Sequence, residues 1–313
     1  MDLKSKIILI SGPTASGKSS FAIKVAKKIN GEIINTDSMQ VYKQLKILTA
    51  RPKKKDQKNI KHHLYGFQSV AKKFSTGAWL KLTIKKIQEI QKRNRIPILV
   101  GGTGLYFKSL SEGLAKMPNI PVKFRNKIRL LQKKIGQKKF YKTLLKLDPK
   151  IKGKFDPNDV QRSIRAFEIK THTKISMYDW LNKTKPIFNK RAFIKFYVNF
   201  ERSKLIKIIQ KRTENMIKKG AIQEVIKFNK LRIKKDKSIN KVIGIDELTK
   251  YLNNQIKLKQ AEELIAIKTR QYAKRQTTWA RSRMIEWTKI EPQQLSSTLK
   301  KINKSPLKLD QLI

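Results

Sequence analysis

The first chemically informative pattern in the chain is G-x-x-x-x-G-K-[ST]. It is satisfied by Gly12, Pro13, Thr14, Ala15, Ser16, Gly17, Lys18 and Ser19. Residues 6–11 before it are mostly apolar, as in a buried strand, and apolar residues recur at helical spacing over 21–29. A strand that turns tightly into a helix directs backbone N–H groups and the positive helix end at one anion. Lys18 adds a charge for phosphates, and the Ser19 hydroxyl suits Mg²⁺. The sequence therefore predicts a phosphate-binding loop.

A carboxylate, Asp37, follows the next strand-like segment at 32–35. Open α/β sheets place their chemistry at the carboxyl ends of the strands, so Asp37 is expected near the phosphate-binding loop. The later strand-like segment at 96–100 runs into Gly101-Gly102-Thr103-Gly104 and ends without a carboxylate. This absence disfavours an ordinary motor-type ATPase. Taken alone, Asp37 could also serve as a helix cap or a turn residue.

Several segments, in order and with similar spacing, resemble bacterial tRNA dimethylallyltransferases. These segments cover the chain from about residue 7 to residue 281 and are far more specific together than any single motif. They are GPTASGKS at 12–19, TDSMQVY at 36–42, TARP at 49–52, HHL at 62–64, VGGTGLYF at 100–107, NDVQRSIRAFEI at 158–169, RTENMIKKGAIQEV at 212–225 and TRQYAKRQTTWAR at 269–281.

The resemblance implies a magnesium-dependent prenyl transfer. A dimethylallyl group would move from dimethylallyl diphosphate to the exocyclic N6 of the adenosine beside the anticodon in tRNA. Asp37 would accept the proton of that amine, and Lys18, the loop N–H groups and Mg²⁺ on Ser19 would stabilise the leaving diphosphate. Thr14 and Ser16 would add hydroxyl groups, and Thr103 would hold the target base near Asp37.

The acceptor adenine is then expected to leave the anticodon-loop stack and to enter a channel between domains. By resemblance, one wall of the channel is Asp37, Ser38, Met39 and Gln40, and another is Gln161, Arg162, Ser163, Ile164 and Arg165. A helix is expected there, with Asp156 as its cap and Pro157 in its first turn. Gln161 and Arg165 share one face of this helix, although without the resemblance an ordinary solvated surface is the better interpretation.

The chain carries 74 Lys and Arg against 22 Asp and Glu, a formal charge of +52. Such a surplus favours binding to polyanions, although a biased genome would produce it too. Over residues 258–281 the expected helix separates two faces. The core face is predicted to hold Ala261, Ile265, Tyr272, Gln276 and Trp279, and the RNA-binding face Arg270, Lys274, Thr277 and Arg281. The lysine-rich segment 51–55 is a candidate second phosphate-binding loop.

The predicted fold class is α/β, with a P-loop NTPase-like parallel sheet core and a helical insertion domain. Strands are expected at about 6–11, 32–35, 96–100 and 193–200, alternating with helices. The core would comprise residues 1–117 and 191–313, and the insertion at 118–190 would close over the tRNA. In the C-terminal part, Ser203 is the expected cap of a helix that stops at Gly220.

The chain contains no cysteine, which excludes disulfides and thiolate metal sites. The N-terminal apolar run is too short for a signal peptide, and no stretch has the length of a membrane span. We therefore expect a cytoplasmic protein, working as a monomer. His62 and His63 are adjacent rather than at metal-ligand spacing, which disfavours zinc, and only their place in the resemblance connects them with the diphosphate pocket.

The chain departs from the family pattern in three segments, at 243–247 (IGIDE), at 170–174 (KTHTK) and at Leu48, and these changes bear on tRNA contact. Two other functions remain open. A small-molecule P-loop kinase would use the same loop for ATP and Asp37 for a hydroxyl acceptor. A non-catalytic RNA-binding protein would keep the fold without the transfer.

Overall fold

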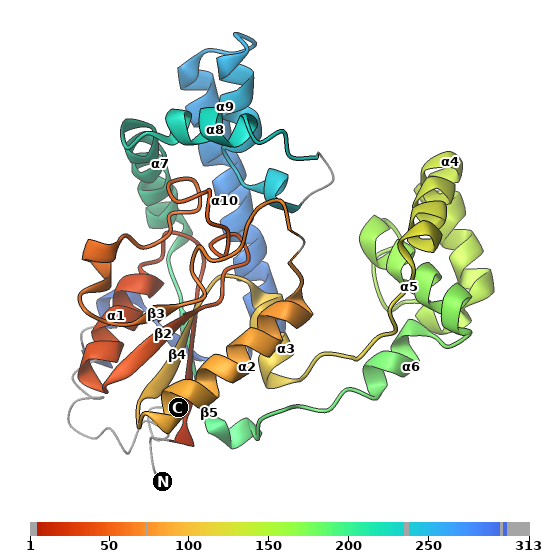
Figure 1. The fold of residues 1–313 in the computed structure, drawn as a ribbon, viewed down its shortest axis with the longest axis horizontal. Helices are drawn as coiled ribbons and strands as arrows, with labels where there is room; N and C mark the ends of the chain where they lie inside the picture. The colour runs from red at the N-terminus through yellow and green to blue at the C-terminus, as the bar shows by residue number, and fades with distance from the viewer. Residues whose placement is uncertain (1–4, 73, 235–237, 295–296, 299–313) are drawn as a thin grey trace. The chain divides into compact units, whose positions relative to one another are not determined.

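The computed structural model describes residues 5–72, 74–234, 238–294 and 297–298. The chain divides into two compact units (Figure 1). The first contains the residues up to Ser109 and those from Phe188 onward, and the second runs from Leu110 to Ile187. The unit boundaries therefore fall a few residues before the expected domain boundaries.

Unit 1 holds all the strands of the described chain together with most of its helices. Its strands are β1 (Ile7–Ser11), β2 (Gly31–Asn35), β3 (His62–His63), β4 (Ile96–Gly101), β5 (Phe193–Val198) and β6 (Thr288–Ile290). Its helices are α1 (Lys18–Lys28), α2 (Thr76–Lys92), α3 (Gly104–Ser111, whose end enters unit 2), α7 (Arg202–Lys218), α8 (Ala221–Asn229), α9 (Ile245–Leu252) and α10 (Leu258–Arg283).

The six strands form one parallel sheet in the order β3-β2-β4-β1-β5-β6. Both faces of its central strands are buried, as a parallel sheet covered by helices requires. On one face, Ile8 and Ile10 of β1 pack with Phe21 of α1. The alternate residues Ile7 and Leu9 point to the other face and are equally buried. The predicted α/β class with a parallel sheet is confirmed.

The strand order brings three chain segments to one edge of the sheet, because β4 lies between β1 and β2. Gly101, the last residue of β4, crosses close to the neighbouring segment. A Cβ atom at this position would lie 2.1 Å from the carbonyl oxygen of Thr36. Two backbone hydrogen bonds hold the crossing together, from the N–H of Thr36 to the oxygen of Val100 and from the N–H of Thr103 to the oxygen of Thr36. Glycine is therefore required at position 101.

A second apolar cluster joins the loop after β2 to α8, α9 and α10. Its buried members include Leu45, Leu48, Val225, Leu248 and Ile265. The cluster is continuous with the sheet edge through the segment that follows Asp37. It therefore fixes helices from the C-terminal third of the chain around a loop from the first fifth.

Unit 2 is helical and comprises α4 (Val122–Leu147), α5 (Val160–Thr173) and α6 (Met177–Asn182). Gly136 interrupts α4 with a backbone φ of +74°, which glycine adopts without strain. The unit has its own core, in which Phe140 of α4 packs on Phe167 of α5. The buried carboxylate of Glu168 forms ion pairs with three arginines. They are Arg125, Arg129 and Arg165.

Four predicted strands are confirmed, and two short ones, β3 and β6, were missed. Two predicted helix caps are wrong. Helix α5 begins after Asp159, whose carboxylate accepts from the N–H of Arg162, rather than after Asp156. Helix α7 follows Glu201, which places Ser203 inside the first turn. In both cases several polar residues stand near the helix start, and the sequence alone does not rank them. No helix in the described ranges combines the length and the apolar character of a membrane span.

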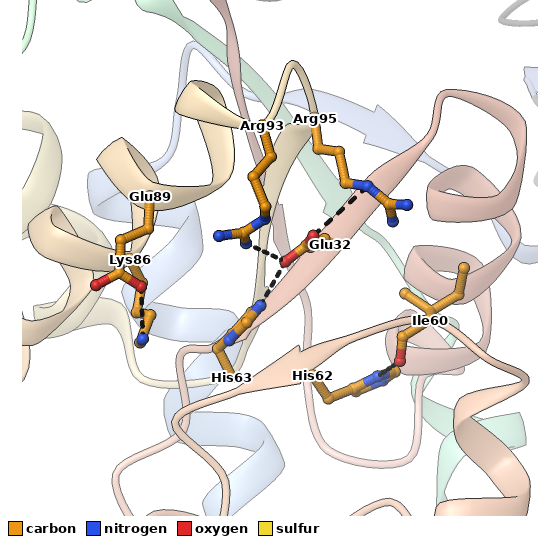
Figure 2. Close-up of polar contacts among 8 residues, drawn as sticks. All are labelled: Glu32, Ile60, His62, His63, Lys86, Glu89, Arg93 and Arg95. Carbon is orange, nitrogen blue, oxygen red and sulfur yellow. Dashed lines mark hydrogen bonds and ion pairs between the residues drawn. The ribbon is translucent and has the colours of Figure 1, made fainter.

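At the start of β2, the fully buried carboxylate of Glu32 joins three parts of unit 1 (Figure 2). Nε2 of His63 on β3 donates to its Oε2 atom at 2.7 Å, and Nη2 of Arg93 donates to the same atom at 2.8 Å. Arg95 lies 3.7 Å from the other oxygen. Burial alone raises the pKa of Glu32, but the hydrogen bonds from Arg93 and His63 outweigh it and hold the pKa below its ordinary value.

The lowered pKa of Glu32 predicts a pH-dependent contribution to stability. A carboxylate with a lowered folded-state pKa stabilises the protein above its unfolded-state pKa, and this contribution is lost as the pH falls through the folded-state value. We expect Glu32→Gln to lower the free energy of unfolding at neutral pH, with a difference from the native protein that shrinks in acid. Urea unfolding at a series of pH values measures it. A difference that stays constant with pH would contradict this electrostatic role.

Candidate active site

A cavity of about 700 Å³ opens at the carboxyl edge of the sheet in unit 1. Its lining comes from chain segments that the fold has brought together. They are 14–20 after β1, 37–40 after β2, 48–50, Tyr65 after β3, 100–105 at the end of β4, residues of α7, 241–243 and residues of α10. The cavity therefore joins the predicted phosphate-binding loop, the predicted carboxylate and the GGTG turn.

The loop at 12–19 is held in place from the far end of the chain. Gln276 of α10 accepts from the N–H of Thr14 at 2.8 Å and donates to the oxygen of Gly102 at 3.0 Å. This one side chain therefore ties the loop after β1 to the turn after β4. Gly17 has a φ of +82° and stands directly before α1. The loop therefore turns into the helix without a side chain at its N-terminus, as an anion-binding turn requires.

Four cationic residues line the cavity, Lys18, Arg212, Lys241 and Arg275. Two of them, Lys18 from the loop and Arg212 from α7, interact electrostatically with Asp37. Lys18 Nζ donates to the oxygen of Pro13 at 3.0 Å, and Arg212 Nη1 donates to Oγ1 of Thr14 at 3.2 Å. Burial lowers the pKa of Lys18 to about 8, with Asp37 raising it and Arg212 lowering it further. Burial also lowers the pKa of Arg212, and Asp37 opposes that change. A bound anion would relieve the repulsion between the two cations.

The carboxylate of Asp37 lines the same cavity and raises the pKa of both Lys18 and Arg212. Its Oδ1 atom accepts from the N–H of Met39 at 2.9 Å. Asp37 therefore also stabilises a turn, which is the alternative role that its sequence position allows. Asn35 fixes the backbone of Asp37, accepting from its N–H and donating to its oxygen, both at 2.9 Å. Thr103 Oγ1 accepts from the N–H of Ser38 at 3.0 Å. The segment that carries the carboxylate is thus held on both sides.

One wall of the cavity is apolar and belongs to the second apolar cluster. It consists of Leu48, Met216, Val242, Ile243 and Ile265. Two aromatic side chains of α10, Tyr272 and Trp279, line the cavity as well and are half-buried. The prediction that these aromatics belong to the core is therefore wrong, whereas Ala261 and Ile265 are buried as expected. Helical periodicity identified the inward face of α10 but could not show that part of this face meets a cavity.

The cavity contains most of the residues predicted for its floor and first wall. Lining residues among them are Thr14, Ala15, Ser16, Gly17, Lys18, Ser19, Asp37, Ser38, Met39, Gln40 and Thr103. Gly12 and Pro13, at the start of the phosphate-binding loop, are buried and do not line the cavity. A Cβ at Gly12 would lie 2.9 Å from Oγ of Ser16, so glycine at this position lets the backbone of the loop pack closely. His62 and His63 also lie outside the cavity lining, contrary to a direct role in its shape.

The residues predicted for the second wall belong to α5 of unit 2. Gln161 and Arg162 are exposed, and Ile164 is half-buried. Ser163 is fully buried and accepts from Gln137 at 3.0 Å, so its hydroxyl lies inside the unit rather than on its surface. Arg165 pairs with the buried Glu168 at 3.2 Å while 34% of its side chain stays exposed, so it is partly engaged within the unit. The exposed face of α10 carries Arg270, Lys274 and Arg281 as predicted.

Sequence reasoning missed Arg212 and Gln276 as site residues. Arg212 stands in a segment used for the resemblance, but a single arginine in a lysine-rich chain gave no separate signal. Gln276 was assigned to the core face of its helix, and its two hydrogen bonds span more than 170 positions in sequence. Such pairings become visible only once the strand order is known.

The described residues contain no group of three or more His, Asp or Glu side chains arranged to hold a metal. The site nevertheless suits Mg²⁺, which keeps several waters and takes one or two protein oxygens beside substrate phosphates. The Ser19 hydroxyl lines the cavity, and Oγ of Ser16 is buried in the loop without a hydrogen-bond partner in the described structure. A metal would thus be held mainly through the ligand's phosphates.

The fold and this cavity define an α/β protein of the P-loop type, with a phosphate cradle, a carboxylate and an apolar wall in one site. This combination of groups is suited to a transferase that acts on a phosphorylated donor. The comparisons with known proteins agree. The family model described as IPP transferase matches residues 40–283.

A tRNA dimethylallyltransferase of Pelagibacter ubique is 70% identical over 312 residues and covers 100% of both chains. One of Rickettsia massiliae is 42% identical, over 95% of this chain and 83% of its own. Among solved structures, the tRNA isopentenylpyrophosphate transferase of Bacillus halodurans matches with a TM-score of 0.70 at 30% identity, covering 98% of each chain. A eukaryotic dimethylallyltransferase acting on tRNA reaches a TM-score of 0.81 at 28% identity, over 95% of this chain and 77% of its own. The chain belongs to the tRNA dimethylallyltransferase family.

The lowered pKa of Lys18 predicts how phosphate binding depends on pH. Above about 8 a growing share of the free protein carries a neutral Lys18, so its affinity for inorganic diphosphate should fall, approaching about tenfold per pH unit. Lys18→Arg keeps its charge in this range and should not show this fall. Calorimetric titration of both proteins measures the difference, and titration of the diphosphate itself cancels in the comparison. Parallel pH dependences of the two affinities would contradict the assignment.

Proposed function

We propose that this cavity transfers a dimethylallyl group from dimethylallyl diphosphate to N6 of the adenosine adjacent to the anticodon in tRNA, giving N6-isopentenyladenosine. Membership of the family establishes dimethylallyl transfer to tRNA as the activity. The donor and the position of the acceptor are the proposal. The observation that carries it is the presence of Asp37 beside Lys18 and Arg212 in one cavity with an apolar wall.

The two ends of the donor match two parts of the cavity. Its diphosphate would bind the loop at 14–19, with Lys18 and Arg212 as counter-charges. Its five-carbon chain would lie on the apolar wall, where burial of hydrocarbon is favourable. Negative charge develops on the diphosphate as the bond to the allylic carbon breaks, so cations already fixed in place stabilise that transition state. Mg²⁺ held by Ser19 and the phosphates would neutralise part of the same charge.

The acceptor nitrogen needs a base, because an exocyclic amine on a purine is a weak nucleophile. As the new N6–C bond forms and the C–O bond to diphosphate breaks, one proton must leave N6. The second carboxylate oxygen of Asp37, which does not accept from Met39, would take that proton. Such general-base help contributes about 10²–10⁴ in rate. The hydrogen bonds between Asn35 and Asp37 and between Thr103 and Ser38 would hold the Asp37 carboxylate in position.

The tRNA would be held mainly by positive charge. The exposed Arg270, Lys274 and Arg281 of α10 would contact phosphates, and Gln161 and Arg162 of unit 2 would contact the anticodon loop. Unit 2 would close over the tRNA, and we expect the protein to work as a monomer in the cytoplasm. The small-molecule kinase alternative accounts for neither the cationic face of α10 nor the family match.

The most direct test of the reaction is mass spectrometry of the nucleosides from tRNA incubated with the protein, Mg²⁺ and dimethylallyl diphosphate. The proposal predicts a new N6-isopentenyladenosine peak that maps beside the anticodon. A peak at another position would overturn the proposed acceptor, and ATP-dependent phosphate transfer without consumption of the allylic donor would favour the kinase.

Asp37→Asn is expected to slow transfer by about 10²–10⁴ while tRNA binding is retained, because the amide keeps the shape but cannot take the proton. Single-turnover rates and equilibrium binding of tRNA measure the two effects. Ser38→Ala, on the same wall, serves as a control that keeps the carboxylate. A rate for Asp37→Asn equal to that of the native protein would refute the role as base.

Neutralising the cations of α10 should weaken tRNA binding in a salt-dependent way. Removing one ion pair with a phosphate reduces the slope of log affinity against log salt by about 0.7–0.9. We expect this for Arg270→Gln and Lys274→Gln. Lys28→Gln, at the end of α1 remote from the phosphate-binding loop, is the exposed control. Equal slopes for all three variants would mean that binding follows total charge rather than this face.

A further inference from the structure

Leu48 belongs both to the apolar wall of the cavity and to the second apolar cluster. Its side chain lines the cavity and is only 7% exposed, and it packs in the same cluster as Val242 and Ile265. It comes from the loop after β2 and faces side chains supplied by α10 and by the segment before α9. Leu48 is therefore the largest apolar side chain that this part of the loop contributes to the cavity lining, beside Thr49 and Ala50.

The loop that carries Leu48 is clamped by the carboxylate of Glu224 on α8. The backbone N–H groups of Lys46, Ile47 and Leu48 all donate to it, at 2.6, 2.9 and 2.9 Å. The loop is closed further by Gln40, whose side-chain amide donates to the oxygen of Thr49 at 2.9 Å. The backbone of Leu48 is thus fixed, so the loop cannot shift aside for a longer ligand without breaking these bonds.

The Leu48 side chain occupies space that is open because residue 244 is a glycine and has no side chain. This glycine has a φ of +105°, and a Cβ built on it would lie 2.6 Å from Cδ2 of Leu48. Leu48 therefore packs directly on backbone, with no side chain of residue 244 behind it. Shortening Leu48 would extend the cavity toward the Gly244 backbone.

We propose that Leu48 sets the chain length of the allylic donor. The inference rests on the proposed function, in which the phosphates occupy the loop at 14–19 and the hydrocarbon lies on the apolar wall. With the diphosphate end fixed, each added methylene must advance into the wall. The Leu48 side chain, packed in its cluster on a fixed backbone, then excludes donors longer than the five-carbon group. In a hydrophobic pocket one methylene alters discrimination by about 10–200-fold.

The test compares two donors on one enzyme preparation, dimethylallyl diphosphate and its homologue with one further methylene at the end of the chain, 3-methylpent-2-enyl diphosphate. The quantity measured is the ratio of their kcat/KM values, which does not depend on how much of a variant is folded. We expect the native protein to prefer the shorter donor by about tenfold or more. Leu48→Ala should reduce this preference at least tenfold, and the milder Leu48→Val should reduce it in part.

Ile47→Ala is the matched control, because Ile47 packs in the same cluster and donates to the same carboxylate but does not line the cavity. Its donor preference should equal that of the native protein. An unchanged preference in Leu48→Ala, or an equal loss of preference in Ile47→Ala, would overturn the role of Leu48 while leaving the proposed function intact. Absence of transfer from either donor by the native protein would instead refute the proposed function, and this inference with it.

Discussion

The carboxylate of Asp37 acts on two of the cations that line its cavity, and the balance among these three charges is the constraint on which the site depends. Lys18 and Arg212 are both drawn away from water, which lowers the pKa of each, and Asp37 is the anion that opposes this change. Without a phosphate ligand, the cations have one carboxylate between them. A diphosphate would supply the missing negative charge and leave Asp37 free to act as a base. In the proposed reaction, the same electrostatics would favour both binding of the diphosphate and proton transfer to Asp37.

The fold positions these charges mainly through the close approach of backbone segments, with few side chains involved. Gly101 lets β4 pass against Thr36, and this crossing places the turn after β4 beside Asp37. Gln276 then ties that turn to the phosphate-binding loop. The charges that follow β1 and β2 and the charge on α7 are therefore positioned by hydrogen bonds between segments far apart in the chain. A positioned site of this kind needs little reorganisation as charge develops in the transition state.

The sequence was sufficient to predict the parallel sheet, the phosphate-binding loop and the place of Asp37, because each is local: a β-branched run, a glycine-rich turn and a carboxylate at a strand end. It did not reveal Arg212 or Gln276, whose roles depend on contacts between elements that are distant in sequence. Tyr272 and Trp279 were assigned to the core because helical spacing distinguishes an inward face from an outward one but does not distinguish a core from a cavity. The ion pair of Arg165 with Glu168 is likewise not evident from periodicity, because the burial of Glu168 depends on packing within unit 2.

The central claim is that Asp37 accepts a proton from the acceptor nitrogen while the phosphate-binding loop holds the leaving group. The most direct measurement is a crystal structure with a tRNA anticodon stem-loop and an unreactive thiolodiphosphate analogue of the donor. The account predicts the diphosphate on residues 14–19 and the carboxylate of Asp37 within about 2.6–3.2 Å of the adenine N6 atom. A carboxylate turned away from that nitrogen, or an analogue bound outside the loop, would contradict it.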